Sequence, residues 1–180
     1  MRNRTYHMVY IGIFAILLTI CSWISLPTII PFTLQTFGVF LTVLLLGGKN
    51  GTLAILIYLL LGAIGIPVFS GFGAGLGYLL GNTGGFAIGF ISIGLAGWLF
   101  EKTFGRKPMV QIFSMLFGLV ICYIFGTLWF MKISMNAGSS YGLVTVLTMC
   151  VFPFIIPDLC KLGLAYIISK RLRPLLKLKL

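Results

Sequence analysis

Charged residues are scarce in this sequence, and acidic residues are almost absent. Only 8% of the 180 residues are charged, and Glu101 and Asp158 are the only acids, against 13 Lys and Arg. Hydrophobic residues make up 59% of the chain, far more than in an ordinary soluble domain. Four intervals contain no charged residue: 5–48, 50–100, 108–131 and 133–157. Because about 20 apolar residues span a bilayer core, these absences exclude a soluble domain and predict an integral membrane protein.

Residues for catalysis and metal binding are also few. His7 is the only histidine, and we expect it at a membrane interface without a chemical role. The four cysteines lie in apolar stretches with no CxxC or Cys/His spacing, which predicts small buried thiols and no metal site. The sequence contains no nucleotide-binding glycine motif and no Ser/His/Asp set. It therefore predicts a binder or carrier that is not an enzyme and holds no cofactor.

Prolines and glycines divide the charge-free intervals into helices. Pro27 and Pro31 interrupt the first interval, and the glycine-rich stretch 65–85 interrupts the second. We expect six membrane spans, at about 8–26, 34–48, 51–64, 83–101, 109–131 and 153–170. The whole chain, 1–180, then forms a single all-α membrane domain.

The basic residues set the expected orientation. With both termini in the cytoplasm, every Lys and Arg except Lys132 and Lys161 lies in a short cytoplasmic segment, as the positive-inside rule favours. The basic segments, which give the chain a net charge of +11, are expected to attract anionic lipid head groups or an acidic partner surface. No nucleic acid partner is expected. The long outer connectors, roughly 27–33, 65–82 and 133–152, carry little charge, and we expect them to fold over a pocket.

Asp158 and Lys161 place two charges inside an expected span. They are three residues apart and therefore on one helix face, and neither charge is stable in lipid. One interpretation is a structural ion pair. The other is a recognition pair, in which the ammonium binds an anionic group of a small ligand and the carboxylate accepts its N–H donors. We expect Pro157 in the first turn of this helix, and Glu101 as a solvated residue at a cytoplasmic helix end.

A few other polar residues can reach an outer pocket. Amide and hydroxyl groups come from Gln35, Asn82, Thr83 and Tyr141, each of which can instead bridge two helices. Glycines recur every four residues, at Gly73, Gly77, Gly81, Gly85 and Gly89. This spacing predicts close helix packing where the segment is helical, and it also allows a ligand-facing backbone at the turn that contains Gly84.

Three stretches together resemble one family. They are IPFTLQTFGVFLTVLLLGG (30–48), YLLLGAIGIPVFSGFGAG (58–75) with GNTGGFAIGF (81–90), and PDLCK (157–161). In order, spacing and context they resemble BioY, the biotin-specific substrate-binding (S) component of energy-coupling factor (ECF) transporters. The resemblance implies an S-component fold in a prokaryotic cell membrane, with a biotin site near the outer face. It also implies a transmembrane coupling protein and two cytoplasmic ATPase subunits as partners.

The resemblance implies roles for the polar residues. Lys161 suits the valerate carboxylate of biotin, Asp158 suits the N–H groups of the ureido ring, and Asn82 suits the ureido carbonyl. Supporting contacts are expected from Gln35, Thr83, Gly84 and Tyr141. A ligand that keeps only the acyl tail leaves the Asp158 carboxylate desolvated and unpaired, so we expect strong rejection of such ligands.

Three positions depart from the family pattern. Asn82 replaces the usual proline of G-P-T-G-G, which adds an amide at the pocket mouth. Pro157 directly precedes Asp158, where the family usually has P-G-D-x-x-K, and stiffens the start of the last helix. Ala15 and Thr19 form a small-xxx-small pair that we expect to contact a partner helix, although the family favours alanine at both positions.

Two other functions remain open from the residues alone. A stand-alone, ion-coupled carrier for a small carboxylate-bearing vitamin could use Asp158 as its proton site, because an intramembrane carboxylate is commonly functional. The glycine repeat also fits an assembly subunit that transports nothing.

Overall fold

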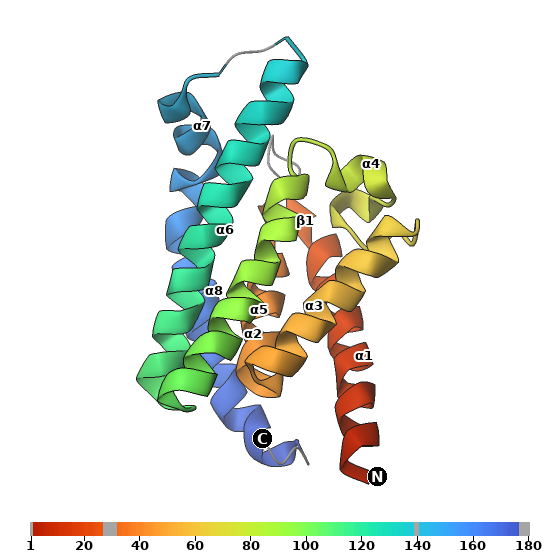
Figure 1. The fold of residues 1–180 in the computed structure, drawn as a ribbon, viewed down its shortest axis with the longest axis vertical. Coiled ribbons are helices and arrows are strands. Elements are labelled where there is room, and N and C mark those ends of the chain that lie inside the picture. The colour runs from red at the N-terminus through yellow and green to blue at the C-terminus, as the bar shows by residue number, and fades with distance from the viewer. Residues whose placement is uncertain (1, 27–31, 139–140, 177–180) are drawn as a thin grey trace.

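The protein is a bundle of helices of unequal length (Figure 1). The computed structural model describes residues 2–26, 32–138 and 141–176, and the side chains from Thr5 onward. The long helices are α1 (Arg2–Trp23), α2 (Gln35–Leu46), α3 (Gly48–Ala63), α5 (Gly84–Phe104), α6 (Pro108–Asn136) and α8 (Phe152–Leu172). The short elements are β1 (Ser25–Leu26), β2 (Phe32–Thr33), η1 (Ser70–Phe72), α4 (Leu76–Leu79), α7 (Leu143–Cys150) and η2 (Arg173–Leu175).

Each expected span coincides with one of the long helices. The largest differences are at the start of α1, which begins at Arg2, and at the end of α6, which continues to Asn136. The outer connectors contain more regular structure than expected, because they form α4, α7 and an antiparallel pair of β1 with β2. Pro27 and Pro31, which were expected to break the first interval, lie outside the described residues.

Helix lengths divide the bundle into two groups. The described stretches that are long and apolar enough to cross a membrane are Thr5–Trp23, Gly84–Phe104, Pro108–Asn136 and Leu143–Leu175. In contrast, α2 and α3 have only 12 and 16 residues, fewer than the about 20 that a bilayer core requires. Every residue of α2 from Gly38 to Leu46 is buried, and a helix that is apolar on all sides belongs in the interior.

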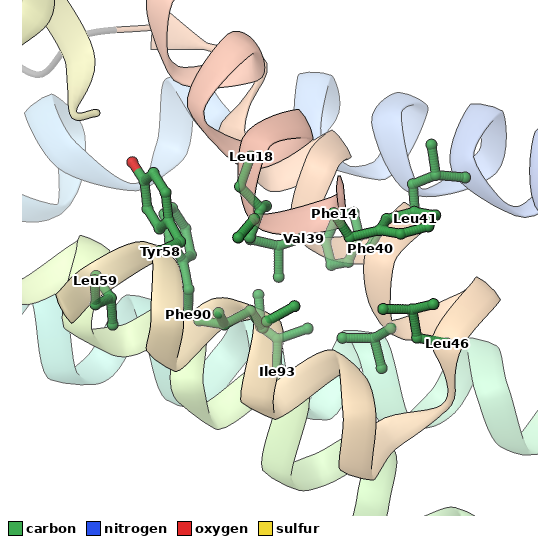
Figure 2. Packing of buried hydrophobic residues seen from close by; sticks show 14 of the residues in the cluster. Phe14, Leu18, Val39, Phe40, Leu41, Leu46, Tyr58, Leu59, Phe90 and Ile93 are labelled. Atoms are coloured by element: carbon green, nitrogen blue, oxygen red, sulfur yellow. The ribbon is translucent and has the colours of Figure 1, made fainter. Parts of the chain in front are cut away.

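The core surrounds α2. Figure 2 shows Phe14 and Leu18 of α1, Phe40 of α2, Tyr58 of α3 and Ile93 of α5 within one buried cluster. All these side chains are at most 7% exposed. The core therefore joins the first half of the chain to α5, and it leaves the outer faces of α1 and α6 to the membrane.

Close packing of α5 on α6 depends on glycine. A Cβ on Gly89 would lie 2.8 Å from Sγ of Cys122, and a Cβ on Gly85 would lie 2.3 Å from Cβ of Trp129. The close packing predicted from the glycine spacing is confirmed at these two positions. The earlier members of the series precede α5, and a Cβ on Gly77 would meet nothing within 4 Å. The repeat is therefore not one continuous helix face.

The end that holds the start of α1 and the end of α8 (Figure 1) contains a partly buried ion pair. Arg106 Nε lies 3.0 Å from Glu101 Oε1, and the N–H of Gly48 donates to Glu101 Oε2 at 2.6 Å. The expectation that Glu101 is a solvated surface residue is wrong, because both carboxylate oxygens have partners within the chain. Burial lowers the pKa of the Arg106 guanidinium, whereas Glu101 raises this pKa and Arg173 lowers it further.

Two arginines close the last turn of α2. Nη2 of Arg106 donates to the carbonyls of Leu44 and Leu45, at 2.8 and 3.2 Å. Nη2 of Arg173 donates to the Leu44 carbonyl at 3.1 Å. The last carbonyls of a helix lack helical donors and carry partial negative charge, so cations stabilise them. These contacts tie α2 to the α5–α6 turn and to η2.

At the opposite end, tryptophans hold the connector between α3 and α5 over the bundle. Nε1 of Trp23 donates to the Pro67 carbonyl at 2.9 Å, and Nε1 of Trp129 donates to the Gly81 carbonyl at 3.0 Å. Between these contacts Phe69 is completely buried. The connector is thus fixed to α1 at its start and to α6 at its end.

Gly118→Ala tests the packing of α6 on α5. A Cβ on Gly118 would lie 2.5 Å from Cα of Ile93, and only a backbone shift relieves that contact. We expect a loss of stability of about 1–3 kcal/mol, seen as a lower unfolding temperature in detergent.

Gly163→Ala is the matched control for this substitution. A Cβ on Gly163, in the interior of α8, meets nothing within 4 Å. Alanine there should raise stability by about 0.5–1 kcal/mol, because glycine is a poor helix residue. Equal unfolding temperatures for the two variants would contradict the packing argument.

Candidate functional site

A buried ion pair lies on the inner face of α8. Lys161 Nζ is 2.9 Å from Asp158 Oδ1, and their side chains are 8% and 2% exposed. The prediction that the two residues share one helix face is confirmed. Removing two charges from water is costly, so the pair requires further partners.

Residues from α2, α6 and β2 supply those partners. The Thr36 hydroxyl donates to Asp158 Oδ1 at 2.7 Å, and the Tyr123 hydroxyl donates to Oδ2 at 2.6 Å. Lys161 donates to the Thr33 carbonyl at 2.7 Å and to Thr36 Oγ1 at 3.1 Å, besides its contact with Asp158. All three ammonium protons therefore have acceptors.

The short strand β2 faces Lys161. The Thr33 hydroxyl accepts the N–H of Gln35 at 3.2 Å, which leaves the Thr33 carbonyl directed to the ammonium. The preceding residue, Phe32, places its ring centre 4.4 Å from Lys161 Nζ. A cation over an aromatic face is stabilised by the ring quadrupole. Strand β2 therefore contacts Lys161 through the Thr33 carbonyl and the Phe32 ring.

The helix that carries the pair starts earlier than expected. Pro153 stands in the first turn of α8, and Pro157 lies inside the helix. The placement of Pro157 in the first turn is therefore wrong. Proline has no N–H, so the carbonyl four residues earlier, that of Pro153, loses its helical donor. The missing helical hydrogen bond therefore lies in the turn immediately before Asp158.

The ion pair lines a cavity of ≈ 70 Å³. Of the predicted site residues, Asp158, Lys161, Gln35 and Thr83 border it. The other lining residues are Thr33, Thr36, Ser70, Tyr78, Phe86, Ala87, Phe90, Leu119, Cys122, Tyr123, Cys150 and Phe154. Mostly apolar walls with a few convergent polar groups are typical of small-molecule sites.

The connector between α3 and α5 covers this cavity. It contributes Ser70, Tyr78 and Thr83 to the lining, so the prediction that this connector folds over a pocket is confirmed. Burial raises the pKa of the Tyr78 phenol, which keeps this group neutral and able to donate a hydrogen bond. The connector therefore adds hydroxyl groups to the site and no charge.

Three predicted site residues do not line the cavity. Asn82 is exposed on the connector, and Tyr141 is 42% exposed before α7. Gly84 starts α5 and packs against the connector, where a Cβ would lie 1.8 Å from the Leu79 carbonyl oxygen. The structure thus gives Gly84 a packing role and leaves Asn82 and Tyr141 outside the cavity.

Polar residues near the cavity also bond to one another. Nε2 of Gln35 donates to the Tyr58 hydroxyl at 2.7 Å, and its Oε1 accepts from the Thr33 hydroxyl at 3.1 Å. Sequence reasoning missed Thr36 and Tyr123, which contact Asp158 directly. Thr36 follows Gln35 in one of the family-like stretches and could have been included. Tyr123 has no marker, because it is one aromatic residue within a long apolar helix.

Ala15 and Thr19 face the interior of the chain. They are 1% and 7% exposed, the Thr19 hydroxyl donates to the Ala15 carbonyl at 3.1 Å, and α1 packs on α2 and α3. This corrects the prediction that the pair meets a partner helix, because helices of the same chain occupy that space. The outward face of α1 instead carries Ile13 and Ile16, which are 52% and 61% exposed.

The fold and the cavity define a class of protein. Apolar helices of membrane-crossing length enclose a charged pair in a small, mostly apolar cavity. Within the described residues, no group of His, Cys, Asp or Glu could hold a metal ion. These features are those of a helical membrane protein that handles a small polar molecule.

Comparison with known proteins gives the family. The profile of the BioY family matches residues 1–178, and the chain belongs to this family. The probable biotin transporter BioY of Pyrococcus horikoshii is 41% identical over 145 residues, which cover 80% of this chain and 81% of the relative. The biotin transporter BioY of Thermotoga maritima is 41% identical over 168 residues, which cover 91% and 94%.

A solved structure agrees with the sequence relatives. It is described as the S-component for biotin from an ECF-type ABC transporter, and it matches with a TM-score of 0.82 and 26% identity. The match covers 96% of this chain and 93% of that one. The family and these relatives are transporters, so the chain is a transport protein and not an enzyme.

Asp158→Asn tests how far the ion pair depends on mutual neutralisation. The substitution leaves the Lys161 ammonium buried without its carboxylate, and we expect it to cost about 3–5 kcal/mol of stability. The double variant Asp158→Asn/Lys161→Met removes both charges and should recover most of the unfolding temperature. A double variant no more stable than the single one would show that the uncompensated charge is not the cause.

Proposed function

We propose that this protein binds biotin and serves as the substrate-specific membrane subunit of an ECF-type ABC transporter. The observation that carries the proposal is the Asp158–Lys161 pair in a mostly apolar cavity, within a chain of the BioY family. The names of the relatives and of the structural neighbour support it.

The ureido ring of biotin complements the charged pair. One edge of a cyclic urea presents an N–H donor beside a carbonyl acceptor. Asp158 offers an acceptor and Lys161 a donor, with Oδ1 and Nζ 2.9 Å apart. Once the ammonium releases one of its present acceptors, the pair can bind that edge through two charge-assisted hydrogen bonds, which are stronger than neutral ones.

Lys161 is fully engaged by the chain, so any contact of its ammonium with biotin requires one of its three hydrogen bonds to be exchanged. To bind the valerate carboxylate, its ammonium must release Thr33, Thr36 or Asp158. The contact with Thr36, at 3.1 Å, is the longest of the three and the one most readily exchanged. The exposed residues Asn82 and Tyr141 and the buried Gly84 stay proposed contacts that require their segments to move toward the ligand.

The cavity must widen to admit biotin. Its volume is ≈ 70 Å³, whereas pockets for small ligands usually have about 300–1,000 Å³. Ser70, Tyr78 and Thr83 belong to a connector with only the short elements η1 and α4. The other walls come mainly from long helices, so we propose that the connector moves outward as biotin enters.

We propose six spans with both termini in the cytoplasm of a prokaryotic cell. Exposed basic residues lie in the α2–α3 turn, around the α5–α6 turn and at the end of α8: Lys49, Lys102, Lys107, Lys170 and Arg171. These segments gather at the end that holds the start of α1 (Figure 1). The positive-inside rule favours that end in the cytoplasm, where a transmembrane coupling protein and two ATPase subunits would supply the energy for uptake.

Titration calorimetry in detergent tests the ligand. Wild-type protein should bind biotin saturably, and Asp158→Asn should bind it about 10–100-fold more weakly, because a hydrogen bond to a charged group is worth about 1.5–3 kcal/mol. Valerate alone should give no signal, because it lacks the ureido edge that pairs with Asp158.

Glu101→Gln is the matched control for this titration. Glu101 is the other acid of the chain and pairs with Arg106, away from the cavity. Its substitution should leave biotin affinity unchanged. No heat from wild-type protein freed of bound ligand would exclude biotin as the substrate.

Uptake into liposomes separates an ECF subunit from a stand-alone carrier. The chain alone should not accumulate biotin under an ion gradient, because the Asp158 carboxylate is paired with Lys161 and hydrogen-bonded by Thr36 and Tyr123 within the chain. Addition of the coupling protein, the ATPase subunits and ATP should start uptake. Gradient-driven accumulation by the chain alone would instead favour an ion-coupled carrier.

A further inference from the structure

Tyr123 stands between two hollows. It lines the ≈ 70 Å³ cavity beside Asp158, and it also lines a second hollow of ≈ 290 Å³. The second hollow is bordered by mostly apolar residues of α6 and α7, with Thr127 of α6, and by Val151 at the junction of α7 with α8. Tyr123 is the residue that the two linings share, so its ring forms a wall between them.

The second hollow faces the membrane. Ile124, Leu128 and Leu143, which border it, are 56%, 60% and 52% exposed. They lie on helix α6 and on the start of α7, within stretches of membrane-crossing length and hydropathy. Exposed apolar side chains at that position contact lipid, so lipid acyl chains have access to this hollow.

Tyr123 is fixed from two sides. Its hydroxyl donates to Oδ2 of Asp158 at 2.6 Å, and a hydrogen bond to an ionised acceptor is short and strong. Its ring packs on the apolar cluster formed by Phe130, Val146 and Cys150 with Val151. The hydrogen bond between Tyr123 and Asp158 thus orients the Asp158 carboxylate and also fixes the Tyr123 side chain between the two hollows.

We propose that Tyr123 is a specificity-determining residue that keeps lipid acyl chains out of the polar cavity. Such a barrier is needed because part of the cavity wall is apolar. Ala87, Phe90 and Leu119 form a surface against which an acyl chain could pack favourably. An acyl chain in that position would compete with the ligand. The identity of that ligand as biotin rests on the proposed function, whereas the barrier itself rests on the two linings.

Photolabelling in liposomes tests the barrier. The full chain is reconstituted with a lipid that carries a photoactivatable group in its acyl chain, and labelled residues are located by mass spectrometry. In wild-type protein the label should reach Ile124 and Leu128 but not Phe90 or Leu119, which are 6% and 4% exposed. In Tyr123→Ala the label should appear on Phe90 and Leu119, and added biotin should suppress it there.

Tyr123→Phe is the matched control, because it lacks the hydroxyl but keeps the ring. Its cavity residues should stay unlabelled, and its biotin affinity should exceed that of Tyr123→Ala. Tyr123→Leu provides a second truncation with more apolar bulk should the alanine variant unfold, and it should be labelled as well. Label on Phe90 in the wild-type protein, or no cavity label in a folded truncation, would overturn the proposal.

The two proposals fail separately. A wild-type protein that binds no biotin in calorimetry removes the proposed ligand, while the labelling pattern still decides the role of Tyr123. Conversely, normal biotin binding together with an unlabelled cavity in both truncations removes the barrier and leaves the function intact.

Discussion

A carboxylate inside a membrane bundle is stable only where its charge is neutralised and its oxygens are hydrogen-bonded, and Asp158 imposes this constraint on the whole fold. Its partners come from separate helices: Lys161 from α8, Thr36 from α2 and Tyr123 from α6. The requirement to satisfy one side chain therefore fixes how three helices meet. The cavity lies where they meet, so the groups that stabilise the bundle are also the groups that a ligand can use.

Local features of the sequence predicted the helices and the charged pair. Breaks in hydrophobicity marked the helix ends, and the spacing of Asp158 and Lys161 gave their contact directly, because residues three apart on a helix are neighbours. The hydroxyl partners of Asp158 could not be predicted in this way. Thr36 and Tyr123 lie 122 and 35 residues from Asp158 in sequence, and their contacts depend on the rotation of packed helices. Glu101 was misjudged for a similar reason, since the N–H of Gly48 comes from a distant turn.

The spacing of small residues correctly predicted that another helix packs closely, but it did not predict which helix. The Gly85 and Gly89 positions bring α6 close to α5, as their spacing suggested. The Ala15–Thr19 pair looked equivalent, yet it faces α2 and α3 of the same chain. A stripe of small residues shows that another helix approaches closely. Which helix approaches is decided by the packing of the whole bundle, and here α2 and α3 take that place.

Helix α2 connects the cavity to the end of the molecule that holds Arg106 and Arg173. It has 12 residues and is therefore about 18 Å long at about 1.5 Å per residue. Thr36, at its start, shares hydrogen bonds with the charged pair, and the carbonyl of Leu44, near its end, is held by Arg106 and Arg173. Because its buried surroundings leave little room for bending, α2 is a rigid link between the hydrogen bonds of the charged pair and those of the two arginines. The position of Thr36 at the cavity is therefore set partly by arginines that bind the same helix near its other end, so the basic end of the bundle helps to define the site.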